Sequence, residues 1–242
     1  MKPAAVVVGV GPETGLGAAL AYRFAQGGLP VFPVGRTESR VRLVAERIER
    51  LGGRARALVA DATVPEQVAA LFARVDASDH VPELVTCTVD LNRRAGLLQT
   101  TPEDFEALWR ANCWAAFLVA REALRRMLPR RRGTLILTGA SASLRARPPF
   151  VAFAAAKFAL RALAQGLARE YGPHGIHVAH VIIDGVLDGD RARRQFPELV
   201  AAKGADGLIQ PASVAECYWQ LHCQPPDAWT HELDLRPATE PF

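Results

Sequence analysis

Cysteine is scarce in this sequence, and its cysteines form none of the patterns that bind metal or build a disulfide framework. The four are Cys87, Cys113, Cys217 and Cys223, and no two are spaced as C-x-x-C. All four fall in segments that we predict to be strand or helix rather than loop. We therefore expect reduced, buried thiols, with neither disulfides nor a metal site.

Long apolar runs are also missing, and the one short basic run is Arg130-Arg131-Arg132. No apolar run approaches the ~18 residues of a membrane-spanning helix, and the N-terminus lacks the charged-then-apolar layout of a signal peptide. The formal net charge is +4, but the arginines are spread over many predicted helices, as is typical of solvated faces. We expect a soluble, cytoplasmic protein that binds neither membrane nor nucleic acid.

Strand-like and helix-like segments alternate along all 242 residues, with no internal repeat and no break in composition. This predicts one α/β domain over residues 1–242, with a parallel, doubly wound sheet whose ligand lies at the C-terminal strand ends. We expect seven strands, at 4–10, 30–35, 54–60, 82–89, 134–138, 176–183 and 229–235. The expected helices are 15–27, 38–51, one from about residue 65 to 75, 102–127, 151–171 and 212–222.

A glycine-rich turn follows the first predicted strand and opens the first predicted helix. Its residues of interest are Gly9, Gly11, Thr14, Gly15, Leu16 and Gly17. Glycine permits a tight turn and lets the backbone approach a pyrophosphate, whose charge is stabilised at a helix N-terminus. We expect these residues to bind a dinucleotide; the alternative is an ordinary glycine-rich loop.

The end of the second predicted strand bears on which dinucleotide is bound. Arg36 follows that strand directly, and no Asp or Glu occupies the strand end. An arginine there favours the 2′-phosphate of NADP, whereas an acidic residue takes the ribose hydroxyls of NAD. We expect NADP, with NAD the less favoured cofactor; the alternative is that Arg36 is only a solvated charge at the start of the next helix.

Residues 150–171 resemble the active-site helix of a known family. Phe153 and Lys157 stand four residues apart at the head of a long apolar-periodic helix, which follows a strand and a run of small residues at 139–143. Together with the glycine spacing, this arrangement resembles the short-chain dehydrogenase/reductase (SDR) superfamily over essentially the whole chain. The resemblance implies a Rossmann-like fold, NAD(P)-dependent oxidoreductase activity on a small molecule, and a homodimer or homotetramer.

The resemblance also implies roles for four residues. Lys157 would hold the nicotinamide ribose, and Asp61 would lie beside the adenine ring, although Asp61 can equally cap the helix that starts near residue 65. Asn112 matches the helix-bend Asn of the family, which orders a water next to the Lys; the alternative is a structural Asn. The usual catalytic Ser falls at Ala140, so Ser141 takes that role with a one-residue shift or is a simple loop hydroxyl.

The sequence departs from the family at the group that normally supplies the proton. The catalytic Tyr is Phe153, the Asn-Ala-Gly after the fourth strand is absent, and the Pro-Gly after the sixth is Asp184-Gly185. One hypothesis is an NADPH-dependent reductase of a carbonyl or activated enoyl compound, similar to the dienoyl-CoA reductase branch. Its proton would come from Ser141, Asp90, Asp184 or a water held by Lys157.

Two other hypotheses stay open: an NADP-binding regulatory or sensor protein without turnover, and a non-redox isomerase or cyclase that uses the same pocket. Arginines expected near the C-terminal strand ends favour an anionic substrate, unless they are merely scattered and solvated. They are Arg93, Arg94, Arg145, Arg147, Arg191, Arg193 and Arg194. The resemblance implies that the polar segment 186–211 is a mobile substrate loop.

Overall fold

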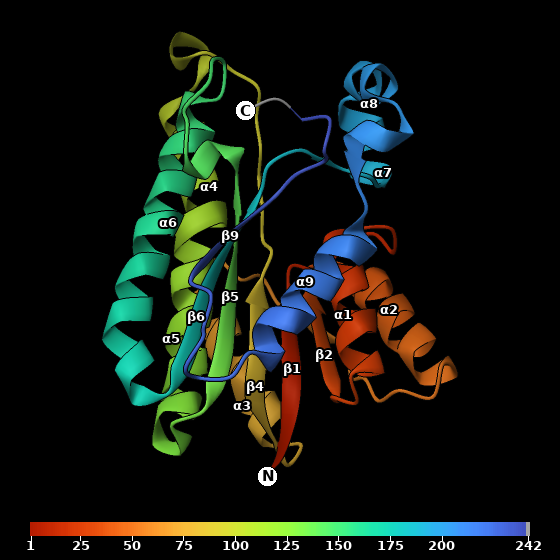
Figure 1. Cartoon of the computed structure of the whole chain (residues 1–242), viewed down its shortest axis with the longest axis vertical. Coiled ribbons are helices and arrows are strands. Elements are labelled where there is room, and N and C mark those ends of the chain that lie inside the picture. The colour runs from red at the N-terminus through yellow and green to blue at the C-terminus, as the bar shows by residue number, and fades with distance from the viewer. Residues whose placement is uncertain (241–242) are drawn as a thin grey trace.

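A seven-stranded parallel sheet forms the centre of the molecule, in the order β3-β2-β1-β4-β5-β6-β9 (Figure 1). The computed structural model describes residues 1–240. The strands are β1 (Lys2–Val8), β2 (Val31–Gly35), β3 (Leu58–Val59), β4 (His80–Cys87), β5 (Gly133–Ala140), β6 (Ile176–Ile183) and β9 (Glu232–Leu235). Two further short strands, β7 (Val186–Leu187) and β8 (Leu208–Ile209), pair with each other.

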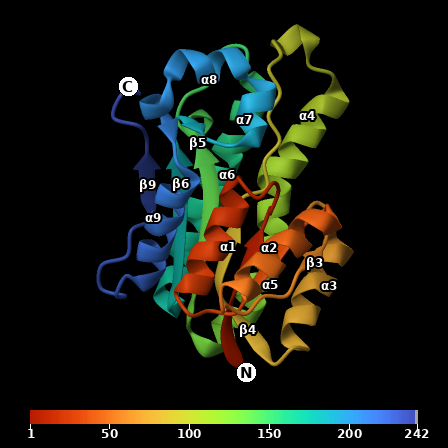
Figure 2. The same ribbon diagram turned by 90° about the vertical axis from the view of Figure 1, so that its right-hand side faces the viewer.

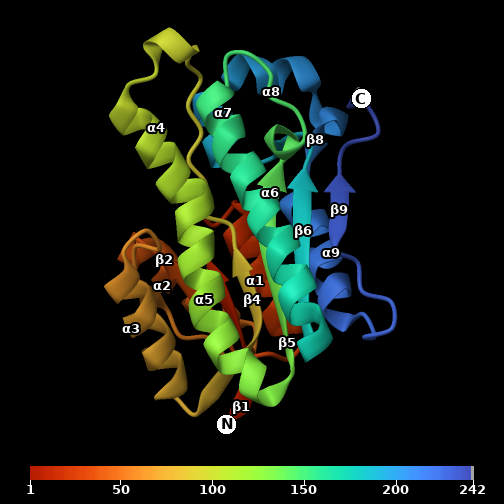
Figure 3. The same cartoon turned by 90° about the vertical axis from the view of Figure 1, so that its left-hand side faces the viewer.

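Helices cover both faces of the sheet. They are α1 (Leu16–Gln26), α2 (Glu38–Arg50), α3 (Pro65–Asp76), α4 (Pro102–Trp109), α5 (Ala115–Met127), α6 (Val151–Tyr171), α7 (Asp190–Gln195), α8 (Pro197–Lys203) and α9 (Pro211–Cys223). Helices α1, α2 and α9 lie on one face and α3, α4, α5 and α6 on the other, as Figures 1 and 3 show from two sides. This is the doubly wound, Rossmann-like architecture that the alternating sequence pattern predicted.

The apolar run at the start of the chain is explained by burial on both faces of the sheet. Along β1, Ala4, Val6 and Val8 belong to the core under α3, α5 and α6. Ala5 and Val7 belong to the core under α1, α2 and α9. Because successive side chains of a strand point to opposite faces, a strand between two helical layers needs apolar residues at every position.

Several predicted strand boundaries were wrong: besides the two described next, β4 is His80–Cys87 rather than 82–89 and β9 is Glu232–Leu235 rather than 229–235. β1 ends at Val8 rather than at residue 10, because Gly9 takes a φ of +107° that interrupts the extended backbone. The third strand is only Leu58–Val59 instead of 54–60. It lies at the sheet edge and pairs with β2 alone, with one more isolated bridge between Val31 and Ala55.

The predicted long helix at 102–127 is interrupted. Residues Arg110–Trp114 form a π-helical turn between α4 and α5, a local irregularity that often marks functional regions of helices. Asn112, in this turn, is 1% exposed. Its Nδ2 donates hydrogen bonds to the carbonyl oxygens of Leu108, at 2.9 Å, and Leu91, at 2.8 Å.

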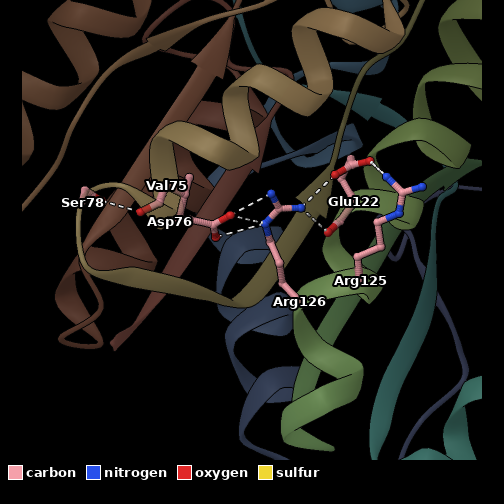
Figure 4. A network of polar contacts seen from close by, with 6 residues as sticks. All are labelled: Val75, Asp76, Ser78, Glu122, Arg125 and Arg126. Carbon is pink, nitrogen blue, oxygen red and sulfur yellow. Dashed lines mark hydrogen bonds and ion pairs between the residues drawn. The ribbon is translucent and has the colours of Figure 1, made fainter.

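An ion-pair network ties α3 to α5 (Figure 4). Arg126 of α5 contacts Asp76, at the end of α3, at 2.7 Å, and Glu122 of its own helix at 2.8 Å. Glu122 also pairs with Arg125 at 2.6 Å. The Arg126 side chain is only 18% exposed, so these charges are partly shielded from water and contribute more than a surface pair would.

Helix α6 accounts for the most apolar stretch of the chain. By length and composition alone, Val151–His174 would suffice to cross a membrane, and it is the one such segment within residues 1–240. In the fold, α6 packs along β5 and β6 and buries Lys157, Leu160 and Ala164. Its composition is therefore that of a core helix.

The cysteines are all free, and the expectation that all are buried was only partly right. Cys87 and Cys113 are buried, Cys217 is half-buried and Cys223 is exposed, which corrects the prediction for Cys223. Burial raises the pKa of the Cys87 thiol to about 11, which keeps it protonated and unreactive. Within residues 1–240, no group of three or more His, Cys, Asp or Glu side chains could hold a metal ion.

Candidate cofactor and active site

A cavity of about 920 Å³ lies at the C-terminal ends of the central strands. Its wall includes Gly9, Gly11, Thr14, Gly15, Leu16, Gly17, Ser141 and Lys157, whereas Arg36, Asp61 and Asn112 do not line it. Helices α7 and α8 lie across this end of the molecule (Figure 2). The structure thus brings together eight of the eleven site residues predicted from the sequence.

The glycine-rich loop forms one wall in a way that only glycine allows. A Cβ on Gly9 would lie 2.5 Å from Thr88 Oγ1, and one on Gly17 would lie 2.8 Å from the Gly9 carbonyl oxygen. A Cβ on Gly11 would meet nothing within 4 Å, so this part of the loop is open. The loop therefore packs closely against its neighbours yet leaves room on its outer side.

Helix α1 begins at this loop without a side-chain cap. Its N-cap is Gly15, which has no side chain that could accept a hydrogen bond from the first amides. The first amides of the helix have no partner within it, and they carry the positive end of the helix dipole. An open glycine loop over uncapped amides fits a pyrophosphate group. Thr14, which accepts a hydrogen bond from the Asp190 amide at 3.2 Å, links the loop to α7.

Arg36 and Asp61 lie beside each other at the β2–β3 edge, outside the cavity. Arg36 Nη1 is 3.9 Å from Asp61 Oδ2, and the Arg36 side chain is 79% exposed. Asp61 accepts hydrogen bonds from Thr63 N at 2.9 Å and Thr63 Oγ1 at 2.7 Å. Burial acts to raise the pKa of Asp61, but these bonds and nearby arginines outweigh it and hold the pKa below its ordinary value.

The alternative role of Asp61 as a helix cap is not present. The N-cap of α3 is Val64, and it makes no side-chain hydrogen bond. Asp61 instead closes the turn before the helix, where its carbonyl oxygen accepts from Val64 N at 3.1 Å. One oxygen of the Asp61 carboxylate therefore accepts hydrogen bonds from Thr63, and the other faces Arg36.

Lys157, on α6, lines the cavity and is only 2% exposed. Its Nζ donates to the carbonyl oxygen of Thr138, on β5, at 3.1 Å. It also lies 3.3 Å from Asp90 Oδ1, just after β4, and 5.5 Å from the centre of the Phe153 ring. A buried ammonium is thus held by a carbonyl, a carboxylate and an aromatic face.

Asp90 joins Lys157 to the segment over the cavity. Its Oδ2 lies 3.0 Å from Arg191 Nη1, on α7. Burial acts to raise the pKa of the Asp90 carboxyl, but the charges and hydrogen bonds of Lys157 and Arg191 outweigh burial and hold that pKa below its ordinary value. Asp90 is therefore a carboxylate at neutral pH, between two cations.

The family's catalytic Ser is replaced, and the nearby serines are Ser141 and Ser143. Ala140, at the position counted for the family's Ser, lies on the cavity wall, and so does Ser141, which opens a short helical turn. Within residues 1–240, the Ser141 hydroxyl has no hydrogen-bond partner. Ser143 is fully buried, and its hydroxyl accepts from the Ala140 amide at 3.2 Å.

Asn112 does not line the cavity but contacts a segment that does. Its hydrogen bond to the Leu91 carbonyl holds the segment that carries Asp90. Its Oδ1 is buried without a partner among the residues described.

Most of the arginines expected near the cavity already have carboxylate partners. Arg93 pairs with Asp104, Arg145 with Asp184, Arg191 with Asp90 and Arg193 with Asp188. Asp184, one of the expected proton sources, is also 2.7 Å from Arg236 and does not line the cavity. Of the arginines left without a carboxylate partner in the described chain, Arg94 lies on the cavity wall.

Comparison with known proteins identifies the family. A family model described as short chain dehydrogenase matches residues 4–198. The chain belongs to the short-chain dehydrogenase/reductase superfamily. Among SDR relatives, the short-chain reductase protein NovJ of Streptomyces niveus is 30% identical over 203 residues, covering 84% of this chain and 74% of its own length. Gluconate 5-dehydrogenase of Gluconobacter oxydans (strain 621H) is 28% identical over 191 residues, with 79% and 73% covered.

Solved structures agree with the SDR assignment. A short-chain dehydrogenase from Rhodopseudomonas palustris is 38% identical with a TM-score of 0.83, covering 97% of this chain and 98% of its own. A metagenomic short-chain oxidoreductase in complex with NADP is 24% identical with a TM-score of 0.82, covering 98% and 97%, and shows a shared fold. Since the relatives are named dehydrogenases and reductases, this chain is an SDR-type oxidoreductase.

The pairing of Lys157 with Asp90, and of Asp90 with Arg191, was missed by reasoning from the sequence. Asp90 and Lys157 had been named as separate candidates for the proton source and Arg191 as part of an anionic-substrate site, but no contact between them was predicted. The available signal was Val89-Asp90 in place of the family's glycine after the fourth strand. Because these residues come from three distant segments, only the folded chain shows that their charges meet.

Proposed function

We propose that the protein is an NADPH-dependent reductase of a small carbonyl or activated enoyl compound, with a proton source other than Tyr. The observation that carries this proposal is the buried Lys157 ammonium on the same cavity wall as the open glycine loop. A reductase needs both a dinucleotide site and a positive group beside the reacting oxygen. The cavity offers the two together.

The chain's own residues suit each part of the dinucleotide. The glycine loop and the α1 amides would hold the pyrophosphate, Lys157 the nicotinamide ribose and Arg36 the 2′-phosphate, with Asp61 near the adenine. When bound, the reduced cofactor supplies a hydride to the substrate. Arg36 favours NADPH over NADH because its guanidinium is exposed and lies 3.9 Å from its acidic neighbour, and so stays accessible to a phosphate.

A second candidate is an NADP-binding protein without turnover. It is favoured by the replacement of both usual hydroxyls, at Phe153 and Ala140, in the cavity wall. Loss of an essential acid commonly removes ~10² to 10⁴ in rate. The isomerase or cyclase hypothesis has no observation of its own in its favour.

The test is fluorescence titration of the purified protein with NADPH and NADH, followed by a scan of ketones, enones and acyl-CoA enones for NADPH oxidation. Arg36→Ala should weaken NADPH binding by about tenfold or more and leave NADH binding unchanged. Arg40→Ala, an exposed arginine of α2 with no ion pair among the described residues, is the matched control. Binding without turnover would favour the sensor, and no binding would refute both.

We further propose that the substrate carries an anionic group that meets Arg94. The cavity wall also includes Phe150, Phe196 and Leu199, so an apolar body with an acidic end fits this cavity. Arg94→Ala should raise the KM for acidic substrates by about tenfold with little change for neutral ones. Arg147→Ala removes the same charge from an exposed position off the cavity and should change neither; equal effects of the two variants would refute the proposal.

The proposal includes one domain over residues 1–242, a cytoplasmic location and a homodimer or homotetramer. The exposed aromatic side chains of α4, α5 and α6 support an oligomer, because a contiguous apolar surface on a soluble protein commonly marks a contact site.

A further inference from the structure

The cavity lacks the hydroxyl groups that would normally stand between the lysine and a substrate. Position 153 is a phenylalanine and position 140 an alanine, and both line the cavity. Beside Phe153 stands the ammonium of Lys157, 5.5 Å from the centre of the ring. An ammonium has three N–H donors. Two have acceptors, Thr138 O and Asp90 Oδ1, and the third has no oxygen or nitrogen acceptor within residues 1–240.

We propose that Lys157 gives this third proton directly to the substrate oxygen, and that Asp90 is the positioning residue that keeps Lys157 charged. This inference rests on the proposed reductase function and names its proton donor. The Lys157 N–H bond breaks, the substrate O–H bond forms and a neutral amine remains. The hydride from the reduced nicotinamide completes the reduction at carbon, and bulk water returns a proton to the amine.

Asp90 is better suited to hold the charge than to give a proton. It is paired with Lys157 through Oδ1 and with Arg191 through Oδ2, and a carboxylate between two cations resists protonation. Its side chain is 30% exposed, so water reaches the pair. Asp184, the other carboxylate considered, is bound by Arg145 and Arg236 and lies off the cavity wall.

The other titratable groups facing Lys157 are neutral near pH 7. They are Cys87 on β4 and His180 on β6. Burial raises the pKa of Cys87 to about 11. Burial also lowers the pKa of His180, more than its bond to Glu232 raises it. Asp90 is therefore the negative charge in contact with Lys157, and Arg191 the second positive charge of the cluster.

The test compares Asp90→Asn with the wild type by NMR and by rate. The only lysines in the sequence are Lys2, Lys157 and Lys203, so protein labelled with ¹³C at lysine Cε gives three resolvable signals. The Lys157 signal is the one absent in Lys157→Met. Without the carboxylate, burial favours the neutral amine, so the Lys157 signal of Asp90→Asn should reach its neutral-amine position at a lower pH than the wild-type signal.

The same shift should appear in the rate. NADPH oxidation with diacetyl or cyclohexenone should fall above a limiting pH, and Asp90→Asn should move that limit down by the same amount as the NMR signal. Asp188→Asn removes a different carboxylate from the cavity wall, one paired with Arg193. It should leave the titration of Lys157 unchanged.

The other outcomes separate a failure of the Asp90–Lys157 pair from a failure of the reductase or of the cofactor site. Turnover with an unchanged NMR titration or an unchanged alkaline limit in Asp90→Asn overturns the role of this pair and leaves the reductase standing. If Ser141→Ala alone abolishes turnover, Ser141 is the donor and the inference is overturned. NADPH binding without oxidation of either probe overturns the proton donor and the reductase together, whereas no NADPH binding refutes the cofactor assignment first.

Discussion

At the scale of single residues, the substitution at position 153 decides the chemistry of the site. Phe153 is 7% exposed and its ring packs on the Lys157 ammonium, so it fills the place of the family's Tyr without offering a proton. If the Tyr hydroxyl is the only group that has been lost, restoring it should increase the rate of reduction. Phe153→Tyr should raise the rate of reduction of simple carbonyls by about 10²-fold or more.

The control for this prediction is Phe150→Tyr, which adds the same hydroxyl to another phenylalanine of the cavity wall. It should not raise the rate, because Phe150 is the N-cap of α6, about two turns before Lys157. Steady-state rates with NADPH and a ketone panel measure both. A failure of Phe153→Tyr in a protein that binds NADPH would mean that the pocket now serves another purpose.

At the scale of elements, the π-helical turn between α4 and α5 supports the cavity from behind. Asn112→Ala would remove hydrogen bonds to the buried carbonyls of Leu91 and Leu108. We expect the free energy of unfolding to fall by about 1 to 3 kcal/mol. Because the Leu91 segment carries Asp90, the variant should also bind NADPH less tightly. Urea unfolding and cofactor fluorescence measure the two effects.

Cys113→Ala is the matched control for the turn. Cys113 is the next residue and is also buried, but its thiol makes no hydrogen bond that holds the segment after β4. It should therefore cost less stability and leave NADPH binding unchanged. Equal losses for the two variants would mean that the turn is sensitive to any change in packing and that Asn112 has no special part in it.

At the scale of the whole molecule, the layer of α4, α5 and α6 (Figure 3) carries exposed apolar side chains. Phe105, Trp109, Phe117 and Phe158 are between 38% and 43% exposed, and rings 109, 114 and 117 form a stacked row. If this face holds copies together, light scattering after gel filtration should give a dimer or tetramer. Phe117→Asp should then shift the protein toward the monomer.

The control for this face lies on the opposite layer. Leu43 of α2 is 41% exposed, and Leu43→Asp should leave the molecular mass unchanged. A wild-type protein that is monomeric at micromolar concentrations would contradict the prediction of an oligomer. A dimer unaffected by Phe117→Asp would place the interface elsewhere.

Patterns along the chain were enough to predict the architecture, and they named eight of the residues that line the cavity. Alternating apolar strands and amphipathic helices required a sheet buried on both faces, and the glycine spacing required a close turn at the end of β1, as Gly9 and Gly17 show. Helix α6 and strand β6 were predicted with their observed bounds. Local periodicity suffices for such features because each depends on residues near in the chain.

Which charges meet could be seen only in the folded chain. Asp90, Lys157 and Arg191 come from the end of β4, from α6 and from α7, and their contacts depend on how parallel strands bring distant segments to one edge. The same is true of Asp184, which Arg145 and Arg236 withdraw from the cavity. Ion pairs depend on distance in space, which residue spacing along the chain does not fix.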